Sequence, residues 1–227
     1  MNEIRIHPRA DAPDPALVAR ARELPAAVIG DALGRLNCPA GLRPYSSPER
    51  LGSMAGPALT VRARPGDNLA VHVAIEHARP GDVIVVDAGG AVDRAIVGEL
   101  MTGRALLRGV HGFVMDGAVR DVDALAVGEL HVYARGATPA GPYKSGPGWL
   151  HAPVTIGGVV VEDGDLVVGD GDGLVVVPRS RLAEAIAGGA DIAAAEAARL
   201  SEMAEGRLSE NMLVTTANLV RVEEGRG

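Results

Sequence analysis

Short apolar runs separated by amphipathic stretches make up the middle of the chain. Residues 83–86 read Val-Ile-Val-Val without a polar interruption, which is typical of a strand buried on both faces. The neighbouring segments continue this pattern and predict strands at 58–64 and 112–115, and helices that begin at Asp67, at Asp93 and after Asp121. The order strand–helix–strand–helix–strand–helix predicts a largely parallel sheet with helical crossovers.

The residues before this unit have a different character. Pro8, Pro13 and Pro15 interrupt the start of the chain, and we expect residues 1–12 to form a flexible or loosely docked tail. Apolar positions then recur at helical spacing over 15–24, and a proline suits the first turn of a second helix over 25–36. Residues 37–55, rich in Pro, Gly and Ser, are predicted to form a long loop. We expect residues 13–227 to fold as a single domain.

The second half of the chain is predicted to contain short strands joined by tight turns. Gly157-Gly158 and the Asp-Gly-Asp-Gly stretch at 170–173 are typical of hairpins. The expected strands are 131–135, 154–156, 159–161, 166–168 and 174–177. An Ala-rich helix over 181–204 follows, and it is apolar on more than one face. Those faces either contact a second subunit or reflect the high helix propensity of alanine.

Composition and charge narrow the possible functions. The chain has 227 residues and a formal charge of −7, so it lacks the basic field of a duplex nucleic-acid binder. Only 2% of the residues are aromatic, which leaves no stacking platform for single strands. A single cysteine, Cys38, excludes an internal disulfide, and no apolar run reaches the ~20 residues that span a bilayer. With no signal-peptide pattern, we expect a cytoplasmic α/β protein that binds neither nucleic acid nor membrane.

Several common catalytic motifs are absent. His72 and His77 are not spaced as in the His-Glu-x-x-His motif of zinc hydrolases, and we interpret them as ordinary helix-face residues. Ser145 does not lie in a Gly-x-Ser-x-Gly elbow. The glycine-rich segments match neither the dinucleotide fingerprint nor the Walker lysine motif.

Charged residues beside glycines do follow two of the predicted strands. One group is Gly98–Met101, in the early turns of a helix, and the other ends in Arg120-Asp121. Ligands of open α/β sheets bind where strands end and helices begin, and helix N-termini offer free N–H groups to a carboxylate. Arg120 offers a planar fork for carboxylate or enolate oxygens, and Asp121 offers a hard oxygen ligand for Mg²⁺. These residues predict a site for a small anion, with or without a divalent metal; a helix cap or a surface ion pair is the alternative.

Taken in order, the motifs of this chain resemble those of the RraA-like family, which includes 4-hydroxy-4-methyl-2-oxoglutarate aldolases and regulators of ribonuclease activity. The likeness covers roughly residues 20–210 and rests on six segments: Gly30–Leu33, Gly56–Thr60, Pro80–Asp87, Gly98–Met101, Gly112–Asp121 and Asp172–Pro178. The resemblance implies an α/β/β/α sandwich of the swivelling-domain type. It also implies assembly as a homotrimer or a dimer of trimers, with active sites at subunit interfaces.

The resemblance further implies a metal site. The family's aldolase signature is an acidic residue, twenty intervening residues and then Arg-Asp. Glu99, followed by residues 100–119 and Arg120-Asp121, meets this spacing, with Glu where the signature usually has Asp. By similarity, Asp121 would bind Mg²⁺ or Mn²⁺ directly and Glu99 would hold metal-bound waters. Glu196, from the last helix of a neighbouring subunit, would orient another such water.

The resemblance also implies that the substrate is a small 2-oxo acid, which residues after two of the predicted strands would contact. The backbone amides of Gly98, Glu99, Leu100 and Met101 would receive its carboxylate. Arg120 would bind the keto oxygen and stabilise the enolate, and Lys144 would contact a distal carboxylate. The implied activity is that of a carbon–carbon lyase, which cleaves 4-hydroxy-2-oxo acids to pyruvate and also decarboxylates oxaloacetate.

Two other functions are compatible with the same resemblance. The first is a non-catalytic regulator that binds a ribonuclease or a helicase, because an acidic chain suits basic partner segments. The second is a methyltransferase, which would need a Gly-rich strand–helix turn with a ribose-binding acid about 20 residues further on. Ala88-Gly89-Gly90 does not fit that turn, whereas the complete set Glu99, Arg120 and Asp121 favours the aldolase.

Overall fold

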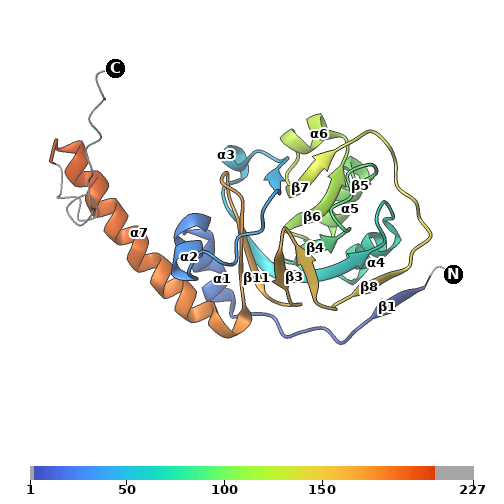
Figure 1. Ribbon diagram of the computed structural model, residues 1–227, viewed down its shortest axis with the longest axis horizontal. Helices are drawn as coiled ribbons and strands as arrows, with labels where there is room; N and C mark the ends of the chain where they lie inside the picture. The colour runs from blue at the N-terminus through green and yellow to red at the C-terminus, as the bar shows by residue number, and fades with distance from the viewer. Residues whose placement is uncertain (1–2, 208–227) are drawn as a thin grey trace, which may run out of the picture.

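The computed structural model describes residues 3–207 and shows a mixed α/β fold (Figure 1). The strands are β1 (Ile4–Ile6), β2 (Arg43–Pro44), β3 (Met54–Ala63), β4 (Val83–Asp87), β5 (Ala95–Val97), β6 (Gly112–Val119), β7 (His131–Ala137), β8 (Gly148–Leu150), β9 (Val154–Ile156), β10 (Val159–Val161), β11 (Leu166–Gly169) and β12 (Leu174–Val177). The α-helices are α1 (Pro15–Arg22), α2 (Ala26–Ala32), α3 (Pro48–Leu51), α4 (Leu69–His77), α5 (Glu99–Leu107), α6 (Val122–Val127) and α7 (Leu182–Ala204), with a 3₁₀ turn at Arg179–Arg181 before α7.

A parallel sheet with helical crossovers forms the centre of the molecule, as the sequence predicted. β3, β4, β6 and β7 are neighbours in that order and all pair in parallel, while α4, α5 and α6 lie in the three crossovers. The apolar run at β4 is buried along both faces, since Ile84 and Val86 belong to one core cluster and Val83 and Val85 to another. The predicted hairpins β9–β10 and β11–β12 are also present.

Three apolar clusters show that the elements stack in four layers. The first cluster packs α4 and α5 on one face of β4 and β6. The second packs the opposite face of these strands against β9 to β12. The third packs the far side of β11 and β12 against α1, α2 and α7. The order helix–sheet–sheet–helix confirms the expected α/β/β/α sandwich.

The N-terminal residues and the loop after α2 are more ordered than expected. Within the predicted tail, β1 pairs in parallel with β8, and Arg9 forms an ion pair with the buried Asp82 at 2.5 Å. The prediction missed both β1 and β8, because these short strands pair across the chain and no hairpin turn joins them. The predicted second helix ends four residues early, where Gly34 and Arg35 adopt positive φ. The predicted loop 37–55 contains β2, α3 and the start of β3.

The segment around the candidate site also differs from the prediction. The helix expected from Asp93 begins only at Glu99, because Ala95–Val97 forms β5, a buried strand that pairs in parallel with β6. β6 itself continues through Asp116 and Gly117 to Val119, where the sequence predicted a turn. A Cβ at Gly117 would lie 3.0 Å from Ala88 Cβ and 3.3 Å from Ile96 Cδ1, so this glycine allows close packing within the sheet.

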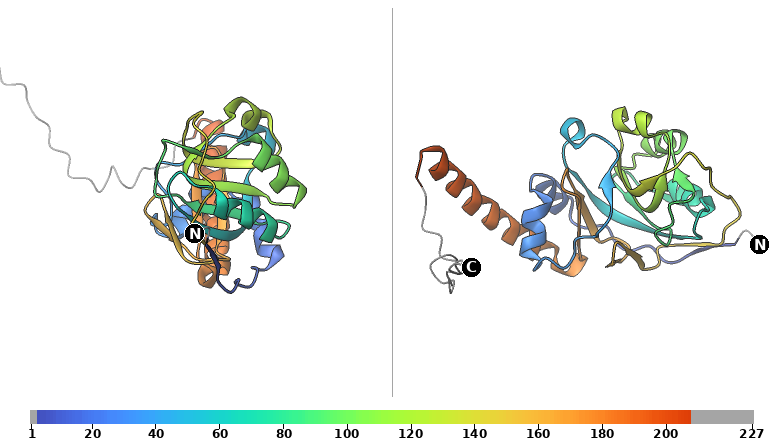
Figure 2. Two further views of the ribbon diagram at one scale, coloured as in Figure 1. Left: turned by 90° about the vertical axis from the view of Figure 1, so that its right-hand side faces the viewer. Right: turned by 45° about the horizontal axis from the view of Figure 1, so that its top comes forward.

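The last helix matches its predicted range but leaves the body of the protein halfway along. Its first half is buried against α2, through Leu182, Ala185, Ile186 and Gly189, and nearly all residues beyond 193 are exposed. Figures 1 and 2 show this second half projecting from the side opposite α5 and α6. None of the helices in residues 3–207 is long and apolar enough to cross a membrane. Part of the domain predicted for 13–227, namely 208–227, lies outside the described residues.

Candidate functional site

The predicted site residues meet where β5 and β6 end. These strands run in parallel with Val97 opposite Val119, so the residues that follow them emerge at the same edge of the sheet. Gly98 is the N-cap of α5, and Asp121 is the N-cap of α6 with a left-handed backbone at φ 58°. A non-glycine residue in that conformation costs of order 1–3 kcal/mol, and such strain clusters at functional sites.

Arg120 and Asp121 lie directly against the start of α5. Asp121 Oδ2 accepts a hydrogen bond from the backbone N–H of Glu99 at 3.0 Å, and Arg120 Nε lies 3.5 Å from the same oxygen. The two side chains remain 42% and 40% exposed. A Cβ at Gly98 would overlap Asp121 Oδ2 and would come within 2.8 Å of Arg120 Cγ. The glycine is therefore needed because both side chains cross the space where a Cβ would be.

The backbone amides at the start of α5 are partly used within the chain. The N–H of Glu99 binds Asp121, and the N–H of Met101 donates to Gly98 O at 3.0 Å. In the described residues the N–H of Leu100 has no backbone partner, and this residue is 80% exposed. The N–H of Gly98 likewise has no partner in the described residues, so Gly98 and Leu100 are the predicted amides left to receive a ligand carboxylate.

Five of the predicted residues line a single cavity of about 300 Å³: Gly98, Leu100, Met101, Arg120 and Lys144. Asn68 and His72, from the start of α4, complete its wall. Burial lowers the pKa of the His72 imidazole, and the positive charges of Lys144 and Arg104 lower it further. The cavity therefore combines two permanent cations with a neutral imidazole, which suits an anionic ligand. A neighbouring hollow of about 330 Å³ contains Asp121, and Arg120 lines both.

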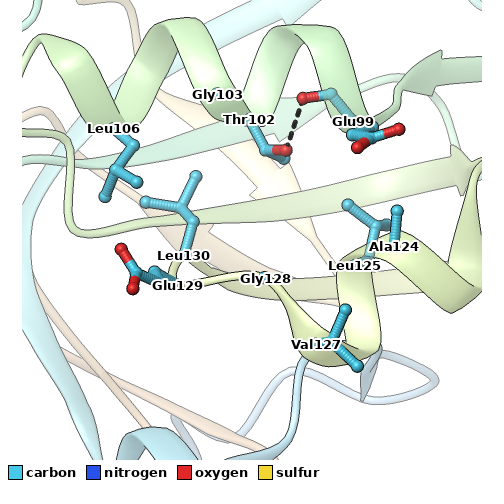
Figure 3. A pocket seen from close by; sticks show the side chains of 10 residues that line it. All are labelled: Glu99, Thr102, Gly103, Leu106, Ala124, Leu125, Val127, Gly128, Glu129 and Leu130. Atoms are coloured by element: carbon cyan, nitrogen blue, oxygen red, sulfur yellow. Dashed lines mark hydrogen bonds between the residues drawn. The ribbon is translucent and has the colours of Figure 1, made fainter.

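The side chain of Glu99 lies apart from this cavity. It lines a hollow of about 260 Å³ between α5 and α6, together with Thr102, Leu106 and Val127 (Figure 3). The hydroxyl of Thr102 donates to the backbone carbonyl of Glu99 at 2.9 Å. The structure thus brings the backbone of Glu99 to Asp121 and directs its carboxylate toward α6, which the spacing of the sequence motif does not reveal.

Within one chain, Glu196 does not join the site. It lies on the exposed second half of α7, which projects from the opposite side of the molecule (Figure 1). In residues 3–207 there is no group of three or more His, Cys, Asp or Glu side chains that could hold a metal ion. Asp121 nevertheless fits a Mg²⁺ site, because Mg²⁺ retains several waters and binds proteins through one or two carboxylates.

Sequence reasoning missed two residues of the cavity, Asn68 and His72. Asn68 is 3% exposed, and its Nδ2 donates to Ile96 O at 3.0 Å and to Met101 Sδ at 3.2 Å, whereas its Oδ1 has no partner in the described structure. Residues four apart share a helix face, so the Asn68/His72 spacing was the available signal. His72 was instead interpreted as an ordinary helix-face residue.

Comparison with known proteins gives consistent results for sequence and structure. The family described as "RraA-like: Aldolase/RraA" matches residues 26–176. A Halalkalibacterium halodurans protein, provisionally named a 4-hydroxy-4-methyl-2-oxoglutarate aldolase, is 41% identical over 165 residues, which are 72% of this chain and 77% of that protein.

Two solved structures show the same fold. An uncharacterised protein from Pseudomonas syringae superposes with a TM-score of 0.78 at 26% identity, covering 88% of this chain and 97% of that one. Streptomyces coelicolor RraAS2, described as an unusual member of the RNase ES inhibitor RraA family, has a TM-score of 0.72 at 28% identity, covering 87% and 100%. The predicted resemblance is confirmed: this chain belongs to the RraA-like family.

Proposed function

We propose that this protein is a divalent-metal-dependent pyruvate aldolase. It cleaves 4-hydroxy-2-oxo acids of the 4-hydroxy-4-methyl-2-oxoglutarate type to pyruvate, and it also decarboxylates oxaloacetate. The observation that carries this proposal is the approach of Arg120 and Asp121 to the start of α5, across the space left by Gly98. The aldolase name of the 41% identical relative supports it.

Each charged group at this turn has a role in the proposed reaction. Asp121 would hold Mg²⁺ or Mn²⁺, which when bound supplies Lewis-acid polarisation of the 2-oxo acid. Arg120 directs its guanidinium at the oxygen where enolate charge develops, and Leu100 N–H receives the adjacent carboxylate. Lys144, which has no ion pair in the described residues, binds a second carboxylate of the substrate. Both reactions leave the enolate of pyruvate, so one set of charges serves both.

We further propose that the active unit is a homotrimer or a dimer of trimers. The projecting half of α7 exposes Leu200 and Met203, and the hollow beside Glu99 offers Leu106 and Val127. Packing of α7 from one subunit near this hollow on the next would cover these apolar groups. It would also bring Glu196 toward the Glu99 and Asp121 carboxylates, where it could orient metal-bound water.

A second candidate function is a regulator that binds a ribonuclease or helicase without catalysis. The similarity to a member of the RNase ES inhibitor RraA family supports it. A regulator of that kind has no need for the Arg120–Asp121 turn, so substitution of Asp121 distinguishes the two candidates.

The test is a pyruvate-release assay on oxaloacetate and on 4-hydroxy-4-methyl-2-oxoglutarate. We expect turnover with Mg²⁺ or Mn²⁺, complete loss with EDTA and recovery on adding metal. Asp121→Asn should remove the activity, whereas Asp123→Asn, an exposed carboxylate in the first turn of α6, should retain it. Absence of pyruvate in every condition, or turnover that survives EDTA, would refute the proposal.

A further inference from the structure

One wall of the cavity is formed by a loop, residues 141–146, with no helix or strand of its own. Gly141, Pro142 and Lys144 of this loop line the cavity, and Lys144 is exposed. A lysine on an unsupported loop would sample many positions, since loops are the mobile parts of a fold. What anchors this loop therefore decides where the ammonium group of Lys144 lies.

Arg94 anchors the start of the loop. Its Nη1 donates to Gly141 O at 2.9 Å, and its guanidinium carbon lies 4.2 Å from the centre of the Tyr143 ring. Arg64 lies on the same ring at 5.6 Å. The next residue, Ala95, donates its N–H to Ala140 O at 2.8 Å. Arg94 thus joins the loop to β5, the strand that leads into Gly98.

Asp67 anchors the end of the loop. Its side chain is buried, and Oδ2 accepts from Ser145 N at 2.7 Å, Gly146 N at 3.0 Å and Ser145 Oγ at 3.2 Å, while Oδ1 accepts from Leu69 N at 2.9 Å. Burial alone would raise the pKa of this carboxyl, but the hydrogen bonds outweigh it and the pKa lies below its usual value. Asp67 therefore stays ionised and binds the loop through charge-assisted hydrogen bonds.

Between the two anchors, the backbone of the loop pairs with the segment before α4. Tyr143 N–H donates to Gly66 O at 2.8 Å, and Asn68 N–H donates to Tyr143 O at 3.0 Å. Lys144 is therefore held on both sides, by Tyr143 before it and Ser145 after it. The ammonium group of Lys144, in contrast, has no ion-pair partner in the described residues.

We propose that Arg94 and Asp67 are positioning residues that fix Lys144 opposite Arg120, and so select 2-oxo acids that carry a second carboxylate. This inference rests on the proposed function, because it assigns the two cations of the cavity to the two ends of one substrate. Neither residue needs to touch the ligand; each acts through the 141–146 loop.

The test compares a ligand with two carboxylates and one with a single carboxylate. Binding of 2-oxoglutarate and of pyruvate is measured by calorimetry with Mg²⁺, and KM and kcat are measured on oxaloacetate. Arg94→Gln should weaken 2-oxoglutarate binding and raise KM about tenfold, the effect of losing one hydrogen bond from a charged group, with pyruvate binding and kcat nearly unchanged.

Arg94→Lys should restore part of the loss, since an ammonium can also lie on the Tyr143 ring. Arg62→Gln, which removes a similar contact with Trp149, is the matched control and should change nothing.

Amide hydrogen exchange supplies a readout that does not depend on turnover. In Arg94→Gln and Asp67→Asn, the amides of residues 141–146 should exchange about tenfold faster, with the strands of the sheet unchanged. Equal weakening of 2-oxoglutarate and pyruvate, or faster exchange with unchanged 2-oxoglutarate binding, would overturn the inference. If the wild type released no pyruvate from oxaloacetate, the proposed function would fail, and the binding and exchange measurements would still decide whether these residues position the loop.

Discussion

The Arg120–Asp121 turn and the turn at His151 each combine a non-glycine residue at positive φ with two oppositely chargeable side chains, but they differ in how exposed these side chains are. Asp121 and His151 both hold a non-glycine backbone at positive φ, 58° and 61°, and each belongs to a pair of oppositely chargeable groups. The Arg120–Asp121 turn is about two-fifths exposed, and Asp121 accepts a single backbone hydrogen bond. The His151–Asp163 pair is buried, with side chains 3% and 6% exposed.

Both oxygens of Asp163 already accept hydrogen bonds within the protein. It accepts from His151 Nδ1 at 2.8 Å, from Ala10 N at 2.9 Å and from Thr60 N at 3.3 Å. Burial alone would raise its pKa, but the hydrogen bond from His151 and those from the backbone hold it below its usual value. The buried Asp163 carboxylate, with three hydrogen bonds, joins the N-terminal segment to β3, whereas the accessible Asp121 carboxylate, with one, is left for chemistry.

The largest expected effect is on activity, from Arg120→Ala. Loss of one positioned donor at a developing negative charge costs about 10²–10³ in rate, so pyruvate release should fall by at least that factor. Since Arg120 is 42% exposed, its removal should leave the melting temperature nearly unchanged. Arg108→Ala, at the other end of α5, serves as the control and should keep full activity. Wild-type turnover in Arg120→Ala would end the catalytic interpretation of this turn.

The next largest effect on activity is expected from Gly98→Ala, at the glycine that leaves room for the Arg120 and Asp121 side chains. A Cβ in Gly98→Ala would displace Arg120 and Asp121, and a shift of about 1 Å in a catalytic group can cost 10²-fold in rate. The backbone at Gly98 is extended, so alanine adds no backbone strain there. Gly171→Ala, in the turn between β11 and β12, is the control, because a Cβ at that position also meets nothing within 4 Å and its backbone is not at positive φ. Equal kcat for the two variants would show that the close approach at Gly98 is unimportant.

The sequence was informative where a pattern is long or a motif is local. The run at 83–86 predicts the buried β4. Glu99 and Arg120-Asp121 were expected at the ends of two parallel strands and do lie there, although the strand before Glu99 is β5, which was not predicted. β1, β5 and β8 were missed because no hairpin turn marks them, whereas the equally short β9 and β10 were recognised from the Gly157-Gly158 turn between them. Asn68 and His72 were missed because they reach the cavity from a different strand–helix unit. No sequence pattern encodes the direction of the Glu99 side chain, which depends on the packing of α5 against α6.

A smaller effect, on stability alone, is expected at the second turn. Asp163→Asn removes a charged acceptor from three donors, and leaving buried donors poorly paired costs about 1–3 kcal/mol of unfolding free energy. Denaturant unfolding should show this loss, while kcat for pyruvate release should match the wild type. Asp172→Asn, an exposed carboxylate in the β11–β12 turn, is the control. A fall in kcat without loss of stability would mean that the buried pair takes part in catalysis and that the contrast between the turns is wrong.

A change in the pH dependence of stability, without an effect on activity, is expected at two other imidazoles, the partly buried His111 and the buried His131, whose rings lie 5.2 Å apart. Burial lowers the pKa of each to about 4, helped by nearby positive charge, whereas an unfolded imidazole titrates near 6.5. The unfolded chain therefore binds more protons as the pH falls from 6.5 to 4, and stability decreases over that window by at most about 1.4 kcal/mol per pH unit for each imidazole. The stability that the ionised Asp163 supplies is lost at lower pH. Because the pKa of this carboxyl lies below its ordinary value of 3.8, that loss begins only as the pH falls below 3.8. Thermal unfolding across pH should show a flatter decline between 6.5 and 4 in His111→Gln/His131→Gln, with the exposed His7→Gln keeping the wild-type slope. An unchanged slope in the double variant would assign the acid sensitivity to other groups.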